Sequence, residues 1–404
     1  MFSKTLVKNT IFIVSVIQHK SAKKKKHKTF QGEIFGHNKP ISQLKLNRDG
    51  DLLFVSSLGA GGATEPLLTV WDPLSGEWLG SFEGHSGAVT DLDVDLKSQY
   101  LISSSNDSTV KIWDVNNGKA LYTFNFTAQC RTVSWSSDMR FFVTATRPFG
   151  GKGAQIHIGE NPILEGADKV DEGDSKETER DAKSMKATID FNENTGVQST
   201  RVLWSPLDEQ VFTCCTDGTI RVFDVTKQKE IKSVVFDPKF SEKSKLADEI
   251  SPSLTDMKYV NNHSAVIISS RNKEAKVFDI EKWDVIRTYS TDRPLNTVAV
   301  HPTANVVALG GGQQAQQAAL SDREGLYECL FHHLIFEERI GLIPCVEKEV
   351  FSPLNAMSFS PDGNIFALGY EQGQVCVYQM DDSFQNTVQQ IEKRFITEEE
   401  EEEL

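Results

Sequence analysis

The sequence lacks any pair of cysteines at the spacing of a metal site or a redox motif. It has six cysteines, none forms a CxxC pair, and Cys214 and Cys215 are adjacent. This usage argues against a zinc site and against a framework of disulfides. We therefore expect reduced, mostly buried thiols, as in a cytosolic protein, and no metal or cofactor.

Apolar runs long enough to cross a membrane are also missing. The run Ile11 to Ile17 near the N-terminus is too short to span a bilayer. Its basic cluster, Lys23 to Lys26, follows the run instead of preceding it, and no small-residue cleavage site is evident. We expect residues 1–28 to be a basic, disordered extension of a cytoplasmic protein with no membrane partner. A targeting signal stays open as the alternative.

A basic stripe for nucleic acid is absent as well. The formal net charge is −14, and the basic N-terminal stretch makes the rest of the chain more acidic still. Proteins that bind nucleic acid usually present clustered Lys and Arg. The charge therefore predicts no direct nucleic-acid readout and favours a basic protein partner.

The chain contains a seven-fold repeat. Each copy has an apolar-x-x-apolar-x-apolar run, a turn, a second strand-like run, and a third run that often ends in an aromatic residue and Asp. The copies begin at Ile41, Val89, Cys130, Thr200, Leu254, Leu295 and Leu354. Alternating apolar residues indicate strands, and a repeat of about 40–45 residues is typical of a four-stranded propeller blade.

The second copy resembles the WD-repeat family most closely, because it carries Gly84-His85, then Asp107, then Trp113-Asp114. The resemblance implies an all-β, seven-bladed propeller. It also implies a structural hydrogen-bonded tetrad, here His85, Ser105, Asp107 and Trp113. A catalytic interpretation of the His, Asp and Ser is the weaker alternative, because no GxSxG motif occurs. We expect no catalytic residues.

The repeats set the domain limits. Residues 29–382 are expected to form the propeller, and the segment Thr29 to Pro40 should supply the outer strand of blade seven and close the ring. An acidic insertion at about 159–199 is expected to be a solvated loop. Residues 383–404 should hold a short helix, with apolar Phe384, Val388, Ile391 and Phe395, and a tail of glutamates.

Glycine-rich segments raise the alternative of a phosphate loop. They lie at "GGGQQ" from Gly310, at "LGAGG" from Leu58 and at "PFGGKG" from Pro148. Gly153 stands where a Walker motif needs Ser or Thr. All three segments fall between the second and third strands of their copies, so we interpret them as enlarged turns on one rim. The pair His332-His333 is not expected to bind metal, since neighbours on a strand face opposite ways.

The last third of the chain resembles a more specific family, the WD-repeat subunit i of eukaryotic translation initiation factor 3. The resemblance is carried by Thr291 to Asn296, Leu309 to Gln314 and Leu334 to Gly341. It implies a non-catalytic scaffold in that factor complex. It also implies binding to the b and g subunits and support for messenger RNA scanning on the small ribosomal subunit.

In that family a helix of the b subunit docks around blades five and six. By position, Asp279 and Arg287 are the candidate contacts, although Asp279 is also interpretable as a solvated carboxylate at a strand end. Two other classes stay open. One is a WD-repeat adaptor in signalling or ubiquitin transfer, and the other is a propeller hydrolase, for which no triad or catalytic domain is visible.

Overall fold

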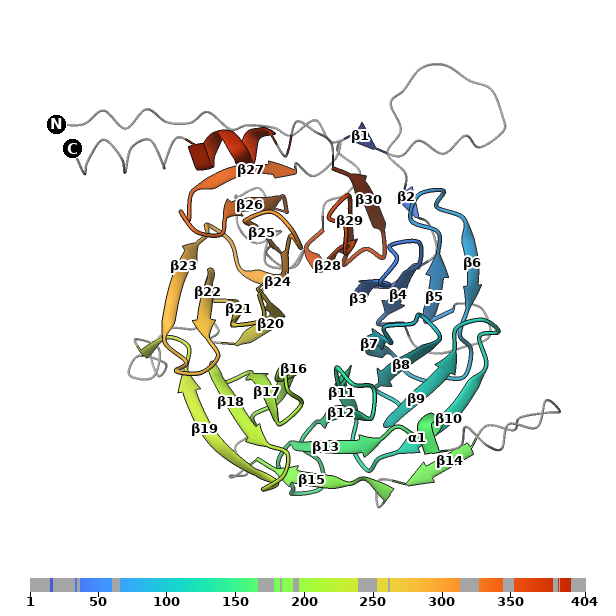
Figure 1. The fold of residues 1–404 in the computed structure, drawn as a ribbon. Helices are drawn as coiled ribbons and strands as arrows, with labels where there is room; N and C mark the ends of the chain where they lie inside the picture. Colours follow the sequence, from blue (N-terminus) through green and yellow to red (C-terminus); the bar gives the residue numbers. More distant parts are fainter. Residues whose placement is uncertain are drawn as a thin grey trace, which may run out of the picture.

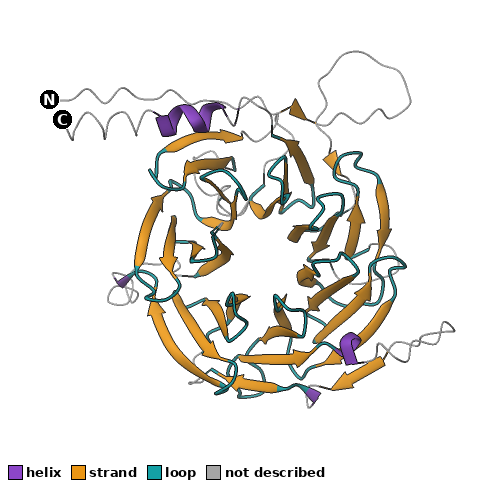
Figure 2. Cartoon of the chain, viewed as in Figure 1, coloured by secondary structure: helices purple, strands orange, loops and turns teal. Residues whose placement is uncertain are grey.

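The computed structural model is a ring of seven antiparallel sheets around a central channel (Figure 1). It describes residues 15–16, 33–34, 37–59, 66–165, 178–181, 184–191, 196–238, 253–260, 262–312, 327–343, 352–380, 384 and 386–393. The predicted all-β propeller of seven blades is confirmed. Figure 2 shows that strands dominate the described chain and helix is confined to short pieces on the outside.

Each blade runs outward from the channel in chain order, from its first strand to its fourth (Figure 1). Blade 1 contains β3 (Ile41–Leu46), β4 (Leu53–Ser57), β5 (Leu68–Trp71) and β6 (Trp78–Ser81). Blade 2 contains β7 (Val89–Val94), β8 (Tyr100–Ser105), β9 (Thr109–Asp114) and β10 (Ala120–Asn125). Blade 3 contains β11 (Cys130–Trp135), β12 (Phe141–Thr146), β13 (Gln155–Glu160) and β15 (Ala187–Asp190).

The second half of the ring repeats this order. Blade 4 contains β16 (Ser199–Trp204), β17 (Gln210–Cys215), β18 (Thr219–Asp224) and β19 (Lys229–Val235). Blade 5 contains β20 (Leu254–Tyr259), β21 (Ala265–Ser270), β22 (Glu274–Asp279) and β23 (Val285–Ser290). Blade 6 contains β24 (Leu295–Val300), β25 (Val306–Gly311), β26 (Cys329–His333) and β27 (Arg339–Ile343). Blade 7 contains β28 (Leu354–Phe359), β29 (Ile365–Tyr370) and β30 (Val375–Gln379).

The N-terminal part of the chain closes the ring. Blade 7 has only three strands of its own, and β2 (Glu33–Ile34) pairs antiparallel with β30 as its outer strand. The two-residue strand β1 (Ser15–Val16) also pairs antiparallel with β30, farther along the same edge. These pairings cover the outer edge of the blade 7 sheet with N-terminal segments and so join the two ends of the ring.

The acidic segment 159–199 is not a loop throughout, which corrects the expectation from its composition. Its β15 is the fourth strand of blade 3, paired antiparallel with β13. Ala187, Ile189 and Phe191 are buried and alternate with exposed residues, a strand pattern that the surrounding charges obscure. The same segment also forms α1 (Pro162–Glu165) and β14 (Thr178–Asp181), and β14 pairs in parallel with β10 as a fifth strand of blade 2.

Apolar side chains fill the space between neighbouring blades. One cluster joins Ile267 of blade 5 to Val307 of blade 6, and another joins Phe212 of blade 4 to Ile268 of blade 5. Second strands are buried along nearly their whole length because both of their faces meet a neighbour. Residues 386–393 form a helix beside blade 6 (the red helix of Figure 1), and Phe384 and Val388 pack into the cluster between blades 6 and 7.

Candidate functional site

Blade 2 holds a closed array of four polar side chains. His85, in the loop before β7, contacts the Asp107 carboxylate through Nδ1 at 2.9 Å and the Ser103 hydroxyl through Nε2 at 2.8 Å. Trp113 Nε1 donates to the same Ser103 oxygen at 2.8 Å. These bonds connect the loop, β8, the turn after it and β9. The array therefore fixes the outer part of the blade to its rim.

The hydroxyl in this array belongs to Ser103, and the prediction of Ser105 was wrong. Ser105 lies two residues farther along the same face of β8, at its end. There its hydroxyl donates to Gly87 O at 2.9 Å and accepts from Asp107 N at 3.1 Å. Residues 103–105 are all serine, so residue type alone could not distinguish them. The pairing register of β8 with β9 places Ser103, not Ser105, within reach of the Trp113 indole.

The Asp107 carboxylate is stabilised in its charged form. Burial by itself would raise its pKa, but hydrogen bonds from His85, Thr109 and the Ser86 backbone outweigh this and lower the pKa well below the ordinary value. A carboxylate with several charge-assisted bonds is strongly held in place. Asp107 is thus the fixed point on which His85 is oriented.

The distances around His85 also match those of a Ser-His-Asp catalytic group. The surroundings differ, because Ser103 is fully buried and its oxygen already accepts the indole N–H of Trp113. A nucleophile must meet its substrate, and this hydroxyl has no exposed surface. The arrangement can lock a blade but cannot present Ser103 to a substrate.

Blade 1 carries a partial version of the array, and blade 3 holds a buried histidine on its third strand, β13. In blade 1, Thr69 on the third strand bonds both His37 Nε2 at 3.0 Å and Trp71 Nε1 at 2.8 Å. In blade 3, His157 lies between the hydroxyls of Thr146 and Thr188, and burial lowers its pKa to about 4. Both histidines are held by hydroxyl groups, so they serve packing within their blades.

The predicted contact Asp279 has a structural role in the turn after β22. Its Oδ1 accepts from the backbone N–H groups of Glu281 and Lys282 at 2.9 and 2.8 Å. Asp72, Asp114 and Asp224 make the same kind of bond at the same place in blades 1, 2 and 4. The carboxylate of Asp279 is therefore one of four equivalent carboxylates that cap this turn. This agrees with the alternative interpretation of Asp279 as a carboxylate at a strand end.

The second predicted contact, Arg287, lies on the outer strand of blade 5 and reaches blade 6. Its Nε donates to Ile335 O at 2.9 Å and is 3.8 Å from Glu337 Oε1. Beside it, Val285, Ile286 and Ile335 are 48%, 43% and 44% exposed. We call these four residues with Glu337 the blade 5–6 surface. Sequence reasoning missed its apolar members, because an exposed apolar residue on an outer strand looks like a core residue in the pattern.

Among the described residues, no group of three or more His, Cys, Asp or Glu side chains is placed to hold a metal ion. His332 and His333 each engage the turn after β26: Nδ1 of His332 lies 3.2 Å from Glu337 O, and Nδ1 of His333 accepts from the backbone N–H of Phe336. The five described cysteines are buried free thiols, whereas Cys345 lies outside the described residues. Nor does any helix in the described part have the length and apolarity needed to cross a bilayer.

Comparison with known proteins bears on the ring as a whole. A family model described as EIF3I matches residues 33–389, from the closing strand β2 to the C-terminal helix. The chain belongs to the family of eukaryotic translation initiation factor 3 subunit I. A subunit I protein of Bombyx mori is 32% identical over 350 residues, which cover 86% of this chain and 95% of the relative. The subunit I protein of Schizosaccharomyces pombe is 30% identical over 350 residues, or 86% of this chain and 96% of the relative.

Membership in the subunit I family accounts for the extent of the ring. The matched region contains all seven blades and the closing pair of β2 with β30, whereas β1 precedes it. The basic residues before it, including Lys23 to Lys26, and the run Glu398 to Glu403 after it lie outside the described residues.

Proposed function

We propose that this chain is a non-catalytic scaffold subunit of the eukaryotic translation initiation factor 3 complex. In this role it binds the b and g subunits, reaches the small ribosomal subunit through the complex and supports recruitment and scanning of messenger RNA. The family supports the role in initiation, because its curated relatives are named as subunit I of this factor. The cytoplasm is the compartment that this role requires.

The observation that carries the proposal is the blade 5–6 surface. Val285 and Ile286 on blade 5 and Ile335 on blade 6 are exposed apolar residues of two blades that are joined here, since Arg287 on one blade donates to Ile335 O on the other. Tyr289 also bridges the blades, donating its hydroxyl hydrogen to Leu334 O at 2.6 Å. The two blade edges that carry the exposed groups are therefore held rigidly together. A rigid apolar strip with a charged edge suits the apolar face of a partner helix.

The proposal refines the choice of contact residue. Asp279 stabilises its own turn, so changing it would alter the turn as well as the surface. Ile286 is 43% exposed, and its apolar side chain does not cap a turn. The b subunit should gain most of its affinity from Ile286 and its apolar neighbours, with Arg287 setting charge preference.

The test is a pull-down of purified full-length chain with the b and g subunits, comparing the wild type with Ile286→Glu. We expect the variant to lose b-subunit binding by about tenfold or more, because a buried charge opposes an apolar contact. Ile231 is the matched control: it occupies the same strand position in blade 4 and is 41% exposed.

Ile231→Glu should bind like the wild type. Equal loss in both variants, or no loss in Ile286→Glu, would remove the blade 5–6 surface from the proposal. If no other initiation-factor subunit co-purifies with the chain from cells, the scaffold role is contradicted. Recovery of signalling or ubiquitin-transfer proteins instead would support the adaptor alternative.

A further inference from the structure

The mouth of the central channel is built from equivalent positions of the seven blades. In each blade, the residue after the second strand donates its backbone N–H to the carbonyl of the residue just before the first strand. Examples are Arg147 N to Gln129 O and Arg271 N to Ser253 O. The turns after the second strands and the starts of the first strands therefore share one rim. We call the second residue of each first strand the channel position: Ser42, Thr90, Arg131, Thr200, Thr255, Asn296 and Asn355.

The channel position has a structural role in four blades. There its side chain donates to the carbonyl of the first residue of the next blade's first strand, as Ser42 does to Val89 O at 2.6 Å and Thr90 to Cys130 O at 3.0 Å. Thr255 and Asn296 repeat the bond to Leu295 O and Leu354 O at 3.1 Å. Blade 3 carries Arg131 at this position, and among the described residues its guanidinium makes no hydrogen bond or ion pair. Within the described chain Thr200 and Asn355 also lack the inter-blade bond, but Arg131 is the channel position that carries a charge.

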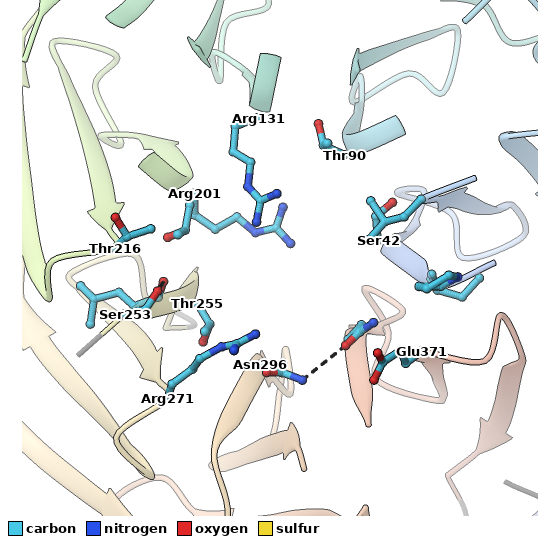
Figure 3. A pocket seen from close by; sticks show the side chains of 16 residues that line it. Ser42, Thr90, Arg131, Arg201, Thr216, Ser253, Thr255, Arg271, Asn296 and Glu371 are labelled. Atoms are coloured by element: carbon cyan, nitrogen blue, oxygen red, sulfur yellow. Dashed lines mark hydrogen bonds between the residues drawn. The ribbon is translucent and has the colours of Figure 1, made fainter. Parts of the chain in front are cut away.

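Two more arginines surround Arg131. Arg201 extends from blade 4 and Arg271 from blade 5, and Figure 3 shows the three side chains entering one opening, with Glu371 on the facing side. The pocket they line has a volume of about 490 Å³. That is the size of a small-molecule site.

The charges at this mouth do not balance. Arg201 is compensated, since it pairs with Asp91 at 2.7 Å and with Asp256 at 2.9 Å. The guanidinium groups of Arg131 and Arg271 have no such partner in the described part of the chain. Arg147, on the rim behind them, bonds Gln129 through Nη1 and leaves a buried Nε without a partner.

The electrostatic effect is visible on Arg131. Burial lowers its pKa to about 10, and the charges of Arg147, Arg201 and Arg271 contribute in the same direction. Asp91 acts in the opposite direction on Arg131, and Glu371 is the acidic side chain among the described residues that line the pocket. Clustered cations at a partly buried opening are stabilised when an anion enters.

We propose that the channel mouth is a binding site for a small polyphosphate anion, held by Arg131 and Arg271 with Arg201 positioned behind them. Phosphate oxygens match the planar donors of guanidinium groups, which bind them in pairs. Donors that converge on one open pocket from three blades suit a compact, multiply charged ion better than an extended acidic peptide. The neighbouring hydroxyls of Ser42 and Thr90 are already used between blades, so the arginines supply the selectivity.

The chain provides the substitutions for the test. Arg131→Thr and Arg271→Thr introduce the residue that blade 4 already has at each position, Thr200 and Thr216. Arg131→Thr also restores a hydroxyl that can make the inter-blade bond, so thermal stability should be kept or raised while binding is lost. Arg48→Thr is the matched control, because Arg48 is an exposed arginine in the turn after β3, at the opposite end of the channel-lining strand.

Titration calorimetry of the full-length protein with sodium tripolyphosphate measures the site directly. We expect one ion per chain, binding that weakens about tenfold or more in Arg131→Thr and in Arg271→Thr, and no change in Arg48→Thr. Glu371→Gln should bind more tightly. Inositol hexakisphosphate and ATP, run in parallel, distinguish clustered phosphates from a linear chain as the natural ligand.

Three results would overturn the proposal. The first is no binding of tripolyphosphate by the wild type at millimolar concentration. The second is equal weakening in Arg48→Thr, which would mark diffuse charge attraction. The third is binding of a hexaglutamate peptide in place of phosphates, which would assign the mouth to an acidic protein segment.

Discussion

Blades 2 and 4 share a strand plan and an Asp-x-Thr turn, yet they secure their outer strands differently. In both, the threonine hydroxyl donates to the aspartate at 2.6 Å, from Thr109 to Asp107 and from Thr219 to Asp217. Blade 2 completes the turn with a buried array of His85, Ser103 and Trp113. Blade 4 has Phe223 in place of the tryptophan.

Blade 4 replaces the lost hydrogen bonds with ring contacts and an arginine. Phe223 stacks on Phe191 of blade 3 with ring centroids 5.5 Å apart. The guanidinium of Arg221 lies over the Phe191 ring, 5.0 Å from its centroid, and pairs with the Asp217 carboxylate at 3.2 Å. The outer strands of blade 2 are therefore secured by hydrogen bonds within the blade, with Trp113 also packed on Phe82 of blade 1. Those of blade 4 are secured by an ion pair and by ring contacts with blade 3.

The largest test of this contrast removes the turn aspartate. Asp107→Ala should lower the free energy of unfolding by about 3 kcal/mol or more, because it removes the carboxylate that holds Nδ1 of the buried His85, the Thr109 hydroxyl and the Ser86 backbone N–H. Asp217 is 29% exposed in its side chain, so Asp217→Ala should lower it by only about 1 kcal/mol. Urea denaturation followed by tryptophan fluorescence and circular dichroism measures both. Equal losses would show that the array adds nothing to the turn.

Exchanging the aromatic residues tests the two locks from the other side. Trp113→Phe should destabilise blade 2 by about 2 kcal/mol, through the lost bond to Ser103 and the space left behind. Phe223→Trp should destabilise blade 4 by about 1–3 kcal/mol, since a larger ring must enter a filled site. The same denaturation experiment applies. A gain in stability from Phe223→Trp would contradict the view that the blade 4 stack is complete.

The smallest effect concerns acid. Because the folded-state pKa of Asp107 lies below its unfolded value, its stabilisation is complete above that unfolded value and is lost as the pH falls toward the folded pKa. Between pH 5 and pH 3 the wild type should lose about 1 kcal/mol that Asp107→Asn does not lose. Paired denaturation curves at the two pH values give the difference, and an identical loss in the two proteins would assign the acid sensitivity elsewhere.

Much of the fold could be predicted because strand signals are local. Six of the seven predicted repeat starts coincide with the first residue of a first strand, and in blade 4 Ser199 precedes the predicted Thr200 by one. The closing strand β2 falls within the predicted segment as well. The outer strand of blade 3 was missed, since Ala187-Thr-Ile189 is a short alternation inside a run of charges. The tetrad hydroxyl was placed two residues too late because serine fills positions 103, 104 and 105.

The sequence by itself determined seven four-stranded repeats, a ring closed by its own N-terminal segment, and the family to which the chain belongs. Those properties depend on alternation, turn residues and spacing, all of which are read along the chain. Only the tertiary structure decided which serine meets Trp113 and which apolar residues stay exposed across blades 5 and 6. It also brought Arg131, Arg201 and Arg271 to one channel mouth. Strand register and ring closure set these contacts, and both join residues that are far apart in sequence.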